Sequence, residues 1–480
     1  MPATKTQPIA ACMIQRDSFP DDILYEILSR LPVLDIIRLR RVCKRILNAS
    51  YERCIWLNVY RNSDFLLPDG PFPSQCAREL EKLLVRAALV RRGWASPSSS
   101  VPFTSNRTFP RELPLYGFTA SVIAGRYFML AEIDGLRWFD LDRPTKEWGT
   151  PILQYLCGEV VAITGLLCHQ VYERTEKFIS AWVAFVRSHK IVILKVSFTS
   201  SGTYMEPIME LPAHNIVAVK MDYGFVLPIK EFNHADEHMD LYHIPTKLKF
   251  SLPMHELVHT LSDLNYMNYL ITPEYLVLMF SQRSETAIEI YPLPGVLSRN
   301  LQDNQLVCSH RGIYPHSISK VQPFNLEPHS SSSNNTSSTR KSSDQHIAFL
   351  ALVYTSRNPM AWTSKIKLQL VDIYFLSGTS LNVVDRCDLT LNVGIATTDL
   401  ACTSSTGSGL AVTHSTPGPL LQAYYISHNS GLKDPMKKKW LELPRDLGSR
   451  ELLAFDGYRG RLCVIHGWSQ MDVIDYIQDP

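Results

Sequence analysis

The sequence predicts an α+β multidomain protein with a small all-α module at the N-terminus followed by a large all-β domain. Two observations lead to this fold class. In the 480-residue chain, apolar residues recur at helical spacing up to about residue 95 and in short alternating or apolar runs after it. The second part also repeats a pair of strands about every 50 residues, which is typical of a β-propeller with several strands in each blade.

The composition is that of a globular protein and gives little direction on partners. Hydrophobic residues make up 45% of the chain and charged residues 20%, which excludes collagen-like, mucin-like and wholly disordered proteins. The formal net charge is only +2, so no overall field favours nucleic acid or an anionic membrane as a partner.

The cysteine pattern and the absence of targeting signals predict an intracellular location. None of the ten cysteines forms a C-x-x-C pair, and no charged and apolar leader opens the chain. No apolar run reaches the roughly 18 residues of a membrane span. We therefore expect reduced thiols and a cytoplasmic and/or nuclear protein that binds neither membrane nor nucleic acid.

Residues 17–61 are predicted to form the helical module. A first helix has Pro20 in its first turn with two aspartates after it and is stopped by Pro32. Asp35 is a suitable N-cap for a second helix that continues to Arg45, and a third follows around Trp56. The apolar stripes of the first two helices consist of Ile23, Leu24, Ile27, Leu28 and Leu31, and of Leu39, Val42, Cys43 and Ile46.

The segments around this module have distinct compositions. Residues 62–95 are predicted to contain a connector helix that runs from Ser74, its N-cap, to Gly93 after its C-terminus. Residues 96–110 are rich in serine and proline and predict a linker. The β domain then covers residues 111–480, while residues 1–16 and an insert at 328–345, rich in serine and asparagine, are predicted to be disordered.

Seven strand pairs, each joined by a polar turn, define the repeat of the β domain. Equivalent points in successive pairs are separated by a nearly constant interval, except where the serine-rich insert lengthens one repeat. This regularity predicts a seven-bladed propeller, with an irregular β-sandwich or two smaller β domains as the alternative. The pairs lie at residues 127–141, 179–196, 223–244, 275–293, 346–375, 409–426 and 461–477.

Residues 18–60 resemble an F-box, the helical motif by which some proteins bind the adaptor of cullin-based ubiquitin ligases. Forty residues cannot bury all of these apolar side chains among themselves, so an apolar face is left for a partner. The resemblance implies that a Skp-type adaptor covers this face and connects the chain to a cullin. The adaptor-binding positions that it implies are Phe19, Pro20, Ile23, Leu24, Ile27, Leu28, Leu31, Pro32, Leu39, Val42, Cys43 and Lys44.

Two positions depart from the family pattern. Phe19 stands where the family usually has leucine, and Ile46 stands where an aromatic residue is common; both keep apolar bulk. The connector helix, with Trp94 after it, is similar to one found in many fungal F-box proteins. The alternative is an amphipathic helical hairpin that caps the β domain.

If the resemblance holds, the chain is the substrate-recognition subunit of a Skp–cullin–F-box ubiquitin ligase. In that role the chain has no catalytic activity and no cofactor of its own, and its β domain binds an unknown target protein. A non-proteolytic F-box scaffold is a further alternative.

One motif points to a different class of function. The sequence contains H-E-x-x-H at His255, Glu256 and His259, the spacing with which a helix presents two zinc ligands and a general base. Pro253 lies where that helix would already be running, and no third ligand follows at family spacing. A zinc-dependent hydrolase is therefore the alternative to the ligase subunit, and we predict no metal site.

Overall fold

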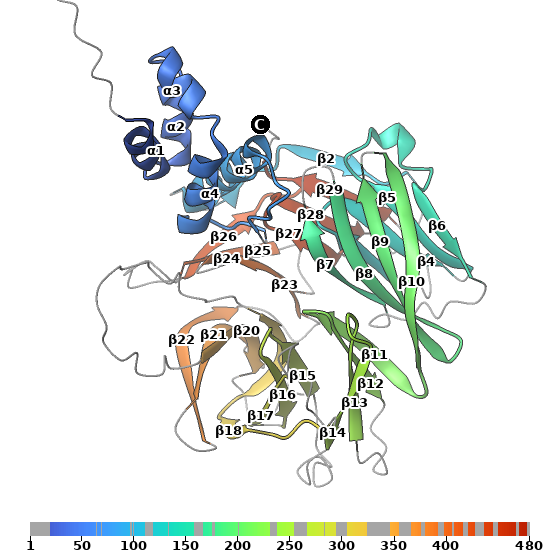
Figure 1. The fold of residues 1–480 in the computed structure, drawn as a ribbon. Coiled ribbons are helices and arrows are strands. Elements are labelled where there is room, and N and C mark those ends of the chain that lie inside the picture. Colours follow the sequence, from blue (N-terminus) through green and yellow to red (C-terminus); the bar gives the residue numbers. More distant parts are fainter. Residues whose placement is uncertain are drawn as a thin grey trace, which may run out of the picture.

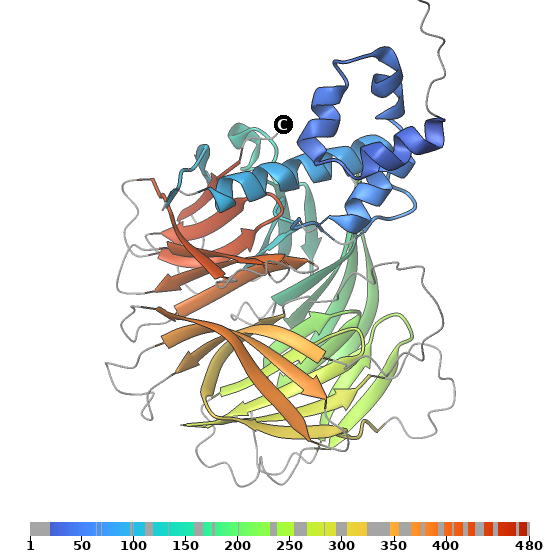
Figure 2. The same cartoon turned by 90° about the vertical axis from the view of Figure 1, so that its left-hand side faces the viewer.

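The computed structural model contains a helical region and a ring of β-sheets (Figures 1 and 2). It describes residues 20–63, 65–68, 70–96, 98, 100–110, 119–132, 134–157, 167–174, 178–199, 201–230, 238–253, 266–282, 284–293, 305–323, 346–354, 366–375, 380–391, 398–405, 408–415, 421–427, 436–444, 450–466 and 470–477. The predicted disordered regions, residues 1–16 and 328–345, lie outside the described residues.

Five helices come first in the described chain. Pro20, expected in the first turn of the first helix, is its N-cap, and the predicted stop before Pro32 is confirmed, since this helix ends at Ser29. The N-cap predicted at Asp35 is wrong, because Pro32 is the N-cap of the second helix and Asp35 lies in its first turn. The expected second helix is wrong in its length: it ends at Leu39, and Cys43 has extended backbone angles before the next helix begins. The helices are α1 (Asp21–Ser29), α2 (Val33–Leu39), α3 (Lys44–Ala49), α4 (Arg53–Asn62) and α5 (Ala77–Ala95).

The break between α2 and α3 is explained by Arg40. Its guanidinium forms an ion pair with Glu81 of α5, with 2.7 Å from Nη1 to Oε1, and its Nε donates to Ser50 Oγ. The hydrogen bonds that Arg40 donates to Glu81 raise the pKa of Arg40, although burial alone would lower it. These contacts fix the end of α2 against α5, so the chain turns before α3.

Helix α5 differs from the predicted connector at both ends. Its N-cap is Cys76 rather than Ser74, and Glu79 Oε2 accepts the Cys76 N–H at 2.8 Å in a capping box. The helix also continues through Gly93 to Ala95. Glycine inside a helix costs about 1 kcal/mol relative to alanine, and the complete burial of the adjacent Trp94 offsets this cost.

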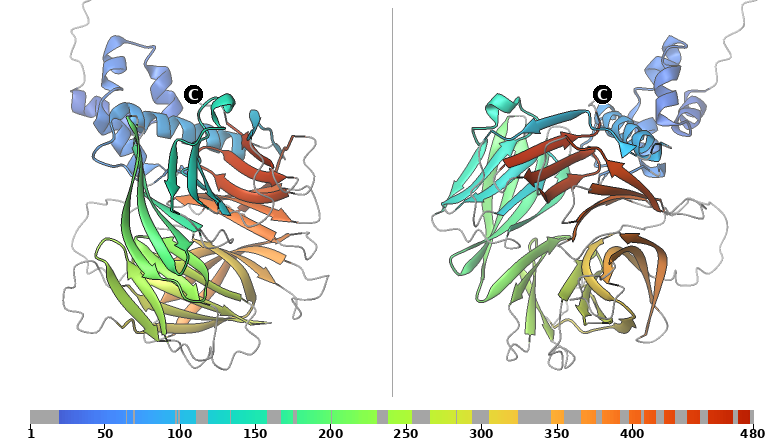
Figure 3. Two further views of the ribbon diagram at one scale, coloured as in Figure 1. Left: turned by 90° about the vertical axis from the view of Figure 1, so that its right-hand side faces the viewer. Right: turned by 180° about the vertical axis from the view of Figure 1, so that it is seen from behind.

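Seven sheets make up the β domain in the described part of the chain, which confirms the seven-bladed propeller (Figures 1 and 3). The predicted strand pairs are the second and third strands of the blades. Blades 1 to 4 contain β3 (Thr119–Ile123), β4 (Tyr127–Glu132), β5 (Gly135–Asp140) and β6 (Leu153–Leu156); β7 (Leu167–Arg174), β8 (Phe178–Arg187), β9 (Lys190–Thr199) and β10 (Gly202–Pro212); β11 (Ile216–Asp222), β12 (Phe225–Lys230), β13 (His238–His243) and β14 (Leu248–Pro253); and β15 (Tyr266–Ile271), β16 (Tyr275–Ser281), β17 (Thr286–Pro292) and β18 (His310–Tyr314).

Of the last three blades, the sixth and the seventh each include a strand from the N-terminal side of the β domain. They contain β19 (Ser317–Pro323), β20 (His346–Tyr354), β21 (Ile366–Phe375) and β22 (Leu381–Leu391); β23 (Thr398–Ser405), β24 (Ser408–Ser415), β25 (Leu421–Ser427) and β26 (Met436–Leu441); and β27 (Arg450–Asp456), β28 (Arg461–His466) and β29 (Gln470–Asp475). Residues 96–110, expected as a linker, instead supply β1 (Ser100–Val101), parallel to β26, and β2 (Ser105–Thr108), antiparallel to β29. The first strands of the domain thus pair with its last blades and close the ring.

Apolar clusters between neighbouring blades hold the ring together. In the described residues there is one such cluster at each of the seven junctions, including the junction between blades 7 and 1, where Phe109 and Trp148 pack against Cys463 and Val473. The middle strands pack against blades on both sides and are therefore buried on both faces, as in β16, whereas the outer strand β10 is largely exposed.

An ionic network reinforces the closure of the ring. Arg461, at the start of β28, donates to Asp142 of blade 1 at 2.8 Å and to Asp475 of β29 at 2.5 Å. Arg459 also bonds to Asp142, and Arg107 of β2 bonds to Asp475 at 2.9 Å. Since Arg461 is only 6% exposed, these charges are shielded from water and couple the two ends of the propeller chain.

Helix α5 belongs to two hydrophobic cores at once. Its first half packs with the other helices through Leu80 and Leu84. Its second half packs with blades 6 and 7 through Val90 and Trp94, and the Trp94 ring lies 6.1 Å from that of Phe455 in an edge-to-face contact. Figure 2 shows α5 running along these blades while α1, α2 and α3 project away from the ring.

The C-terminus of α5 is fixed to blade 6 by Lys439. Its ammonium group donates to Ser96 O at 2.5 Å and to Ser98 O at 2.9 Å, and the residue is 3% exposed. Ser96 is the C-cap of α5, so the lysine also complements the negative end of the helix dipole. No helix among the described residues is long and apolar enough to cross a membrane.

Candidate functional site

Three large aliphatic side chains are exposed in the described helical region. Ile23 and Ile27 of α1 have 44% and 46% of their surface accessible, and Val42, just before α3, has 65%. Ile23 and Ile27 are four residues apart, so they lie on one face of α1. Below, these three residues are called the exposed apolar set.

The position of α3 brings the third member of this set close to α1. Arg45 in the first turn of α3 forms an ion pair with Asp21 at the start of α1, with 2.7 Å between Nη2 and Oδ1. The two helices are also in direct contact. The segment that carries Val42 and Cys43 is therefore held beside the N-terminal end of α1.

The other predicted adaptor-binding residues divide by their burial. Leu28 is 1% exposed and packs with Ile55 and Trp56, so it supports the fold of the module rather than its surface. Phe19 lies outside the described residues. The exposed positions besides the apolar set are Pro20, Pro32, Cys43 and Lys44, and the half-buried ones are Leu24, Leu31 and Leu39.

The core beneath the exposed face is closed by polar contacts. The Trp56 indole N–H donates to Ser50 O at 2.7 Å, and the Trp56 side chain is completely buried. The Arg40 guanidinium lies over the Tyr51 ring, 4.5 Å from its centroid, as well as bonding to Glu81. These contacts make α1 to α5 one packed unit with a fixed surface.

Sequence reasoning missed two parts of this region. Tyr51 is 56% exposed beside Arg40, but a lone tyrosine between two helices carries no periodic signal. The packing of α5 against the other helices of the module was also not predicted. Its Leu80 and Leu84 follow helical spacing, yet the spacing does not indicate which partner they pack against.

The zinc motif cannot be placed in this site. His255, Glu256 and His259 lie outside the described residues. Within the ranges that are described, no group of three or more histidine, cysteine, aspartate or glutamate side chains is arranged to hold a metal ion.

A family model matches the helical part of the chain. The F-box domain family matches residues 17–58. A search of curated proteins gave no match. Among solved structures, the chain is similar to the WD40 domain of SCAP from fission yeast, at 10% identity and a TM-score of 0.39, covering 78% of this chain and 98% of that chain.

Two further solved structures are similar to this chain. One is Drosophila Plexin A in complex with Semaphorin 1b, at 10% identity and a TM-score of 0.42, covering 78% of this chain and 88% of that chain. The other is the β-propeller domain of Vanderwaltozyma polyspora Nup133, at 10% identity and a TM-score of 0.40, covering 77% of this chain and 97% of that chain. From the family match and the sheets described above, residues 17–58 are an F-box domain, and the large domain that follows it is a seven-bladed β-propeller.

Proposed function

We propose that this protein is the substrate-recognition subunit of a Skp–cullin–F-box ubiquitin ligase. The F-box binds a Skp-type adaptor and through it a cullin, and the propeller binds the target protein. The observation that carries the proposal is the exposed apolar set, because apolar side chains of this size on a small helical module favour a protein partner that covers them.

The adaptor-binding surface in this proposal has an apolar centre and a basic edge. Ile23, Ile27 and Val42 form the centre, and Cys43 and Lys44 extend it towards α3. Burial of the three centre side chains contributes most of the binding energy, since each fully buried aliphatic side chain stabilises a contact by about 1.5–3 kcal/mol. Lys44 sets the orientation and rate of association more than the affinity.

The connection between the F-box and the propeller supports a role in positioning the target protein. Helix α5 has 19 residues and is therefore about 28 Å long. Because its two halves belong to the cores of the helical module and of blades 6 and 7, the F-box and the propeller cannot swing freely. A target held by the propeller is then kept at a fixed place relative to the ligase, which raises the effective concentration of its lysines near the ubiquitin-carrying enzyme. The chain itself performs no chemical step.

Replacing Val42 by aspartate tests the adaptor surface. Val42 is 65% exposed, so the charge is tolerated in the free chain but becomes buried and unpaired under an adaptor. We expect Val42→Asp to reduce co-purification of a Skp-type adaptor at least tenfold. Val307→Asp is the matched control, since Val307 is an exposed valine, 72% accessible, in the propeller. Equal adaptor recovery with both variants would contradict the proposal.

A further inference from the structure

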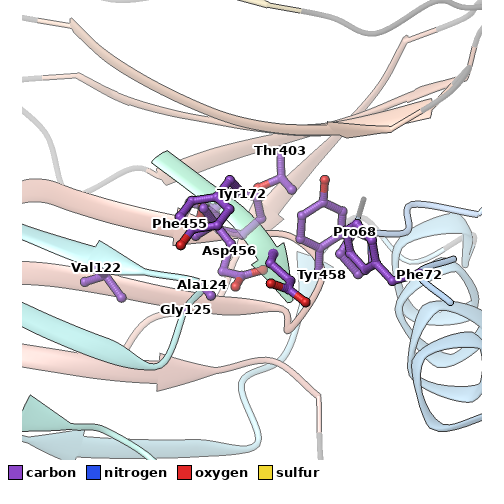
Figure 4. Close-up of a pocket in the computed structure, with 12 residues that line it drawn as sticks. Pro68, Phe72, Val122, Ala124, Gly125, Tyr172, Thr403, Phe455, Asp456 and Tyr458 are labelled. Atoms are coloured by element: carbon purple, nitrogen blue, oxygen red, sulfur yellow. Dashed lines mark hydrogen bonds between the residues drawn. The ribbon is translucent and has the colours of Figure 1, made fainter. Parts of the chain in front are cut away.

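A cavity of about 190 Å³ opens at the end of the propeller channel that lies nearest the helices (Figure 4). Its walls come from the ends of the strands β3, β7, β23 and β27 and from the turns that follow β3 and β27. The segment between α4 and α5 adds Pro68 and Phe72. The cavity is thus bounded by both parts of the molecule, and we refer to it as the channel-end cavity.

Aromatic and acidic side chains dominate the lining of the channel-end cavity. Tyr172, Phe455 and Tyr458 supply aromatic surface, and Glu173 and Asp456 supply two carboxylates. No lysine or arginine lines it among the described residues. In that same part of the chain neither Glu173 nor Asp456 forms an ion pair, so the cavity carries uncompensated negative charge.

An irregularity in the backbone of β7 brings three consecutive residues to the channel-end cavity. The strand has a β-bulge at Tyr172, because Val171 pairs with Ala181 while Glu173 pairs with Ser180. In a regular strand consecutive side chains alternate between faces, whereas here Val171, Tyr172 and Glu173 all contribute to the same cavity. The Tyr172 ring is held by stacking on Trp182, with 4.3 Å between ring centroids.

The Asp456 carboxylate is fixed by its surroundings. Asp456 Oδ1 accepts the backbone N–H of Arg459 at 3.1 Å. Gly125, with φ of +63°, lies directly beneath it, and a Cβ at that position would come within 2.2 Å of Asp456 Oδ2. Arg459 and Arg461 both bond to Asp142, and Arg461 also donates to Gly125 O, but neither forms an ion pair with Asp456. The Asp456 carboxylate therefore has a fixed position, and no ion pair among the described residues neutralises its negative charge.

A second hollow of about 620 Å³ adjoins the channel-end cavity. The two share Val171, Tyr172, Thr403 and Tyr458, and the second adds Asp222, a further carboxylate. His169 also lines this hollow, and burial lowers its pKa to about 4, so the imidazole adds no positive charge at neutral pH.

The size and lining select one class of ligand. A volume of about 190 Å³ is smaller than the ~300–1,000 Å³ of typical small-molecule sites, and fits a single long side chain better than a whole ligand. Two carboxylates attract a cation, while aromatic faces contact both a cation and an aliphatic stem. The described residues offer no three-ligand metal site. Lysine and arginine are the side chains that combine a cation with such a stem.

We infer that the channel-end cavity binds a lysine or arginine side chain of a polypeptide segment, with Glu173 and Asp456 pairing with the cation and Phe72, Tyr172 and Phe455 contacting its stem. This inference rests on the proposed function, in which the polypeptide is the ligase target. Because Pro68 and Phe72 belong to the α4–α5 segment, the cavity places the bound segment directly beside the helical module.

Two peptides of equal length test the inference on the full chain. The probes are acetyl-Leu-Arg-Leu-amide and acetyl-Leu-Glu-Leu-amide, and saturation-transfer difference NMR detects even weak binding. We expect the arginine peptide to give at least a fivefold larger signal than the glutamate peptide. The double variant Glu173→Gln with Asp456→Asn should remove this preference, since the amides keep the shape and the acceptor oxygens but not the charge.

The control variant is Glu206→Gln with Asp134→Asn, which removes two exposed carboxylates outside the cavity and should keep the preference. An unchanged urea unfolding midpoint verifies that each variant is folded. Equal signals from both peptides, a preference for glutamate, or a preference that survives in the double variant would overturn the inference. Since no adaptor is present in this experiment, its failure leaves adaptor binding by the F-box untouched, and loss of adaptor binding does not alter the peptide result.

Discussion

Trp94→Ala is expected to lower the free energy of unfolding by about 3–5 kcal/mol. The indole is completely buried and is the largest contact between α5 and the propeller, where it packs against Phe455 and Tyr476. Its removal leaves a cavity in the core that α5 shares with blades 6 and 7. Urea unfolding monitored by circular dichroism measures the loss, and limited proteolysis should cleave the variant first next to α5.

Trp440→Ala is the matched control for this prediction. Trp440 lies on β26 and is 36% exposed, so we expect a loss of only about 1 kcal/mol. Trp94→Phe should cost less than Trp94→Ala, because it keeps much of the ring and removes an indole N–H that has no hydrogen-bond partner among the described residues. A Trp94→Ala protein as stable as Trp440→Ala would show that α5 is not joined to the propeller core.

Arg461→Met is the second substitution with a large expected effect, a loss of about 3 kcal/mol. The variant leaves Asp142 and Asp475 partly buried with one cation fewer at the junction of blades 7 and 1. Arg38→Met is the control, because the Arg38–Asp35 pair is on the surface and contributes less than about 1 kcal/mol. The free energies of unfolding of the two variants at pH 7 provide the comparison.

The same network makes stability depend on pH in acid. Burial alone would raise the pKa of Asp142, but Arg459 and Arg461 outweigh it and hold that pKa well below its usual range. The pKa of Asp475 is lowered in the same way, by Arg461 and Arg107 against the effect of burial.

A carboxylate with a depressed pKa in the folded state contributes stability that is complete above its unfolded pKa of about 4 and is lost as the pH falls further. We therefore expect the free energy of unfolding to decrease from pH 5 to pH 2, and to decrease less steeply in Arg461→Met. If the free energy of unfolding of the wild type and of Arg461→Met decreased equally between pH 5 and pH 2, this role of the ionic network would be contradicted.

The sequence was most informative where the fold buries both faces of a strand. The middle strands of the blades, such as β16 and β17, pack between neighbouring blades and read as continuous apolar runs, so all seven pairs were predicted. Outer strands such as β10 mix polar and apolar residues, and β2 is the polar segment Ser105–Thr108. Its strand conformation depends on pairing with β29, more than 350 residues away in the sequence, which local patterns do not reveal.

The candidate site was predicted as a set of positions but not as a surface. Periodicity identifies Leu28 and Ile27 equally as members of the apolar stripe, yet Leu28 is buried against α4 and Ile27 is exposed. Which side of α1 faces inward depends on the packing of α4 and α5, and this is decided by tertiary contacts such as the Arg40–Glu81 pair. The channel-end cavity was not predicted, because its residues come from five separate segments that only the closed ring and the packing of the helices bring together.

The most direct test of the account is the affinity of the full chain for a purified Skp-type adaptor, measured by isothermal titration calorimetry. We predict one-to-one binding by the wild type and at least a hundredfold loss of affinity in Ile23→Asp with Ile27→Asp, whose exposed side chains leave the fold of the free chain intact. A wild-type chain that does not bind the adaptor, or a double variant that binds it as tightly as the wild type, would contradict the assignment of this protein as a ligase subunit.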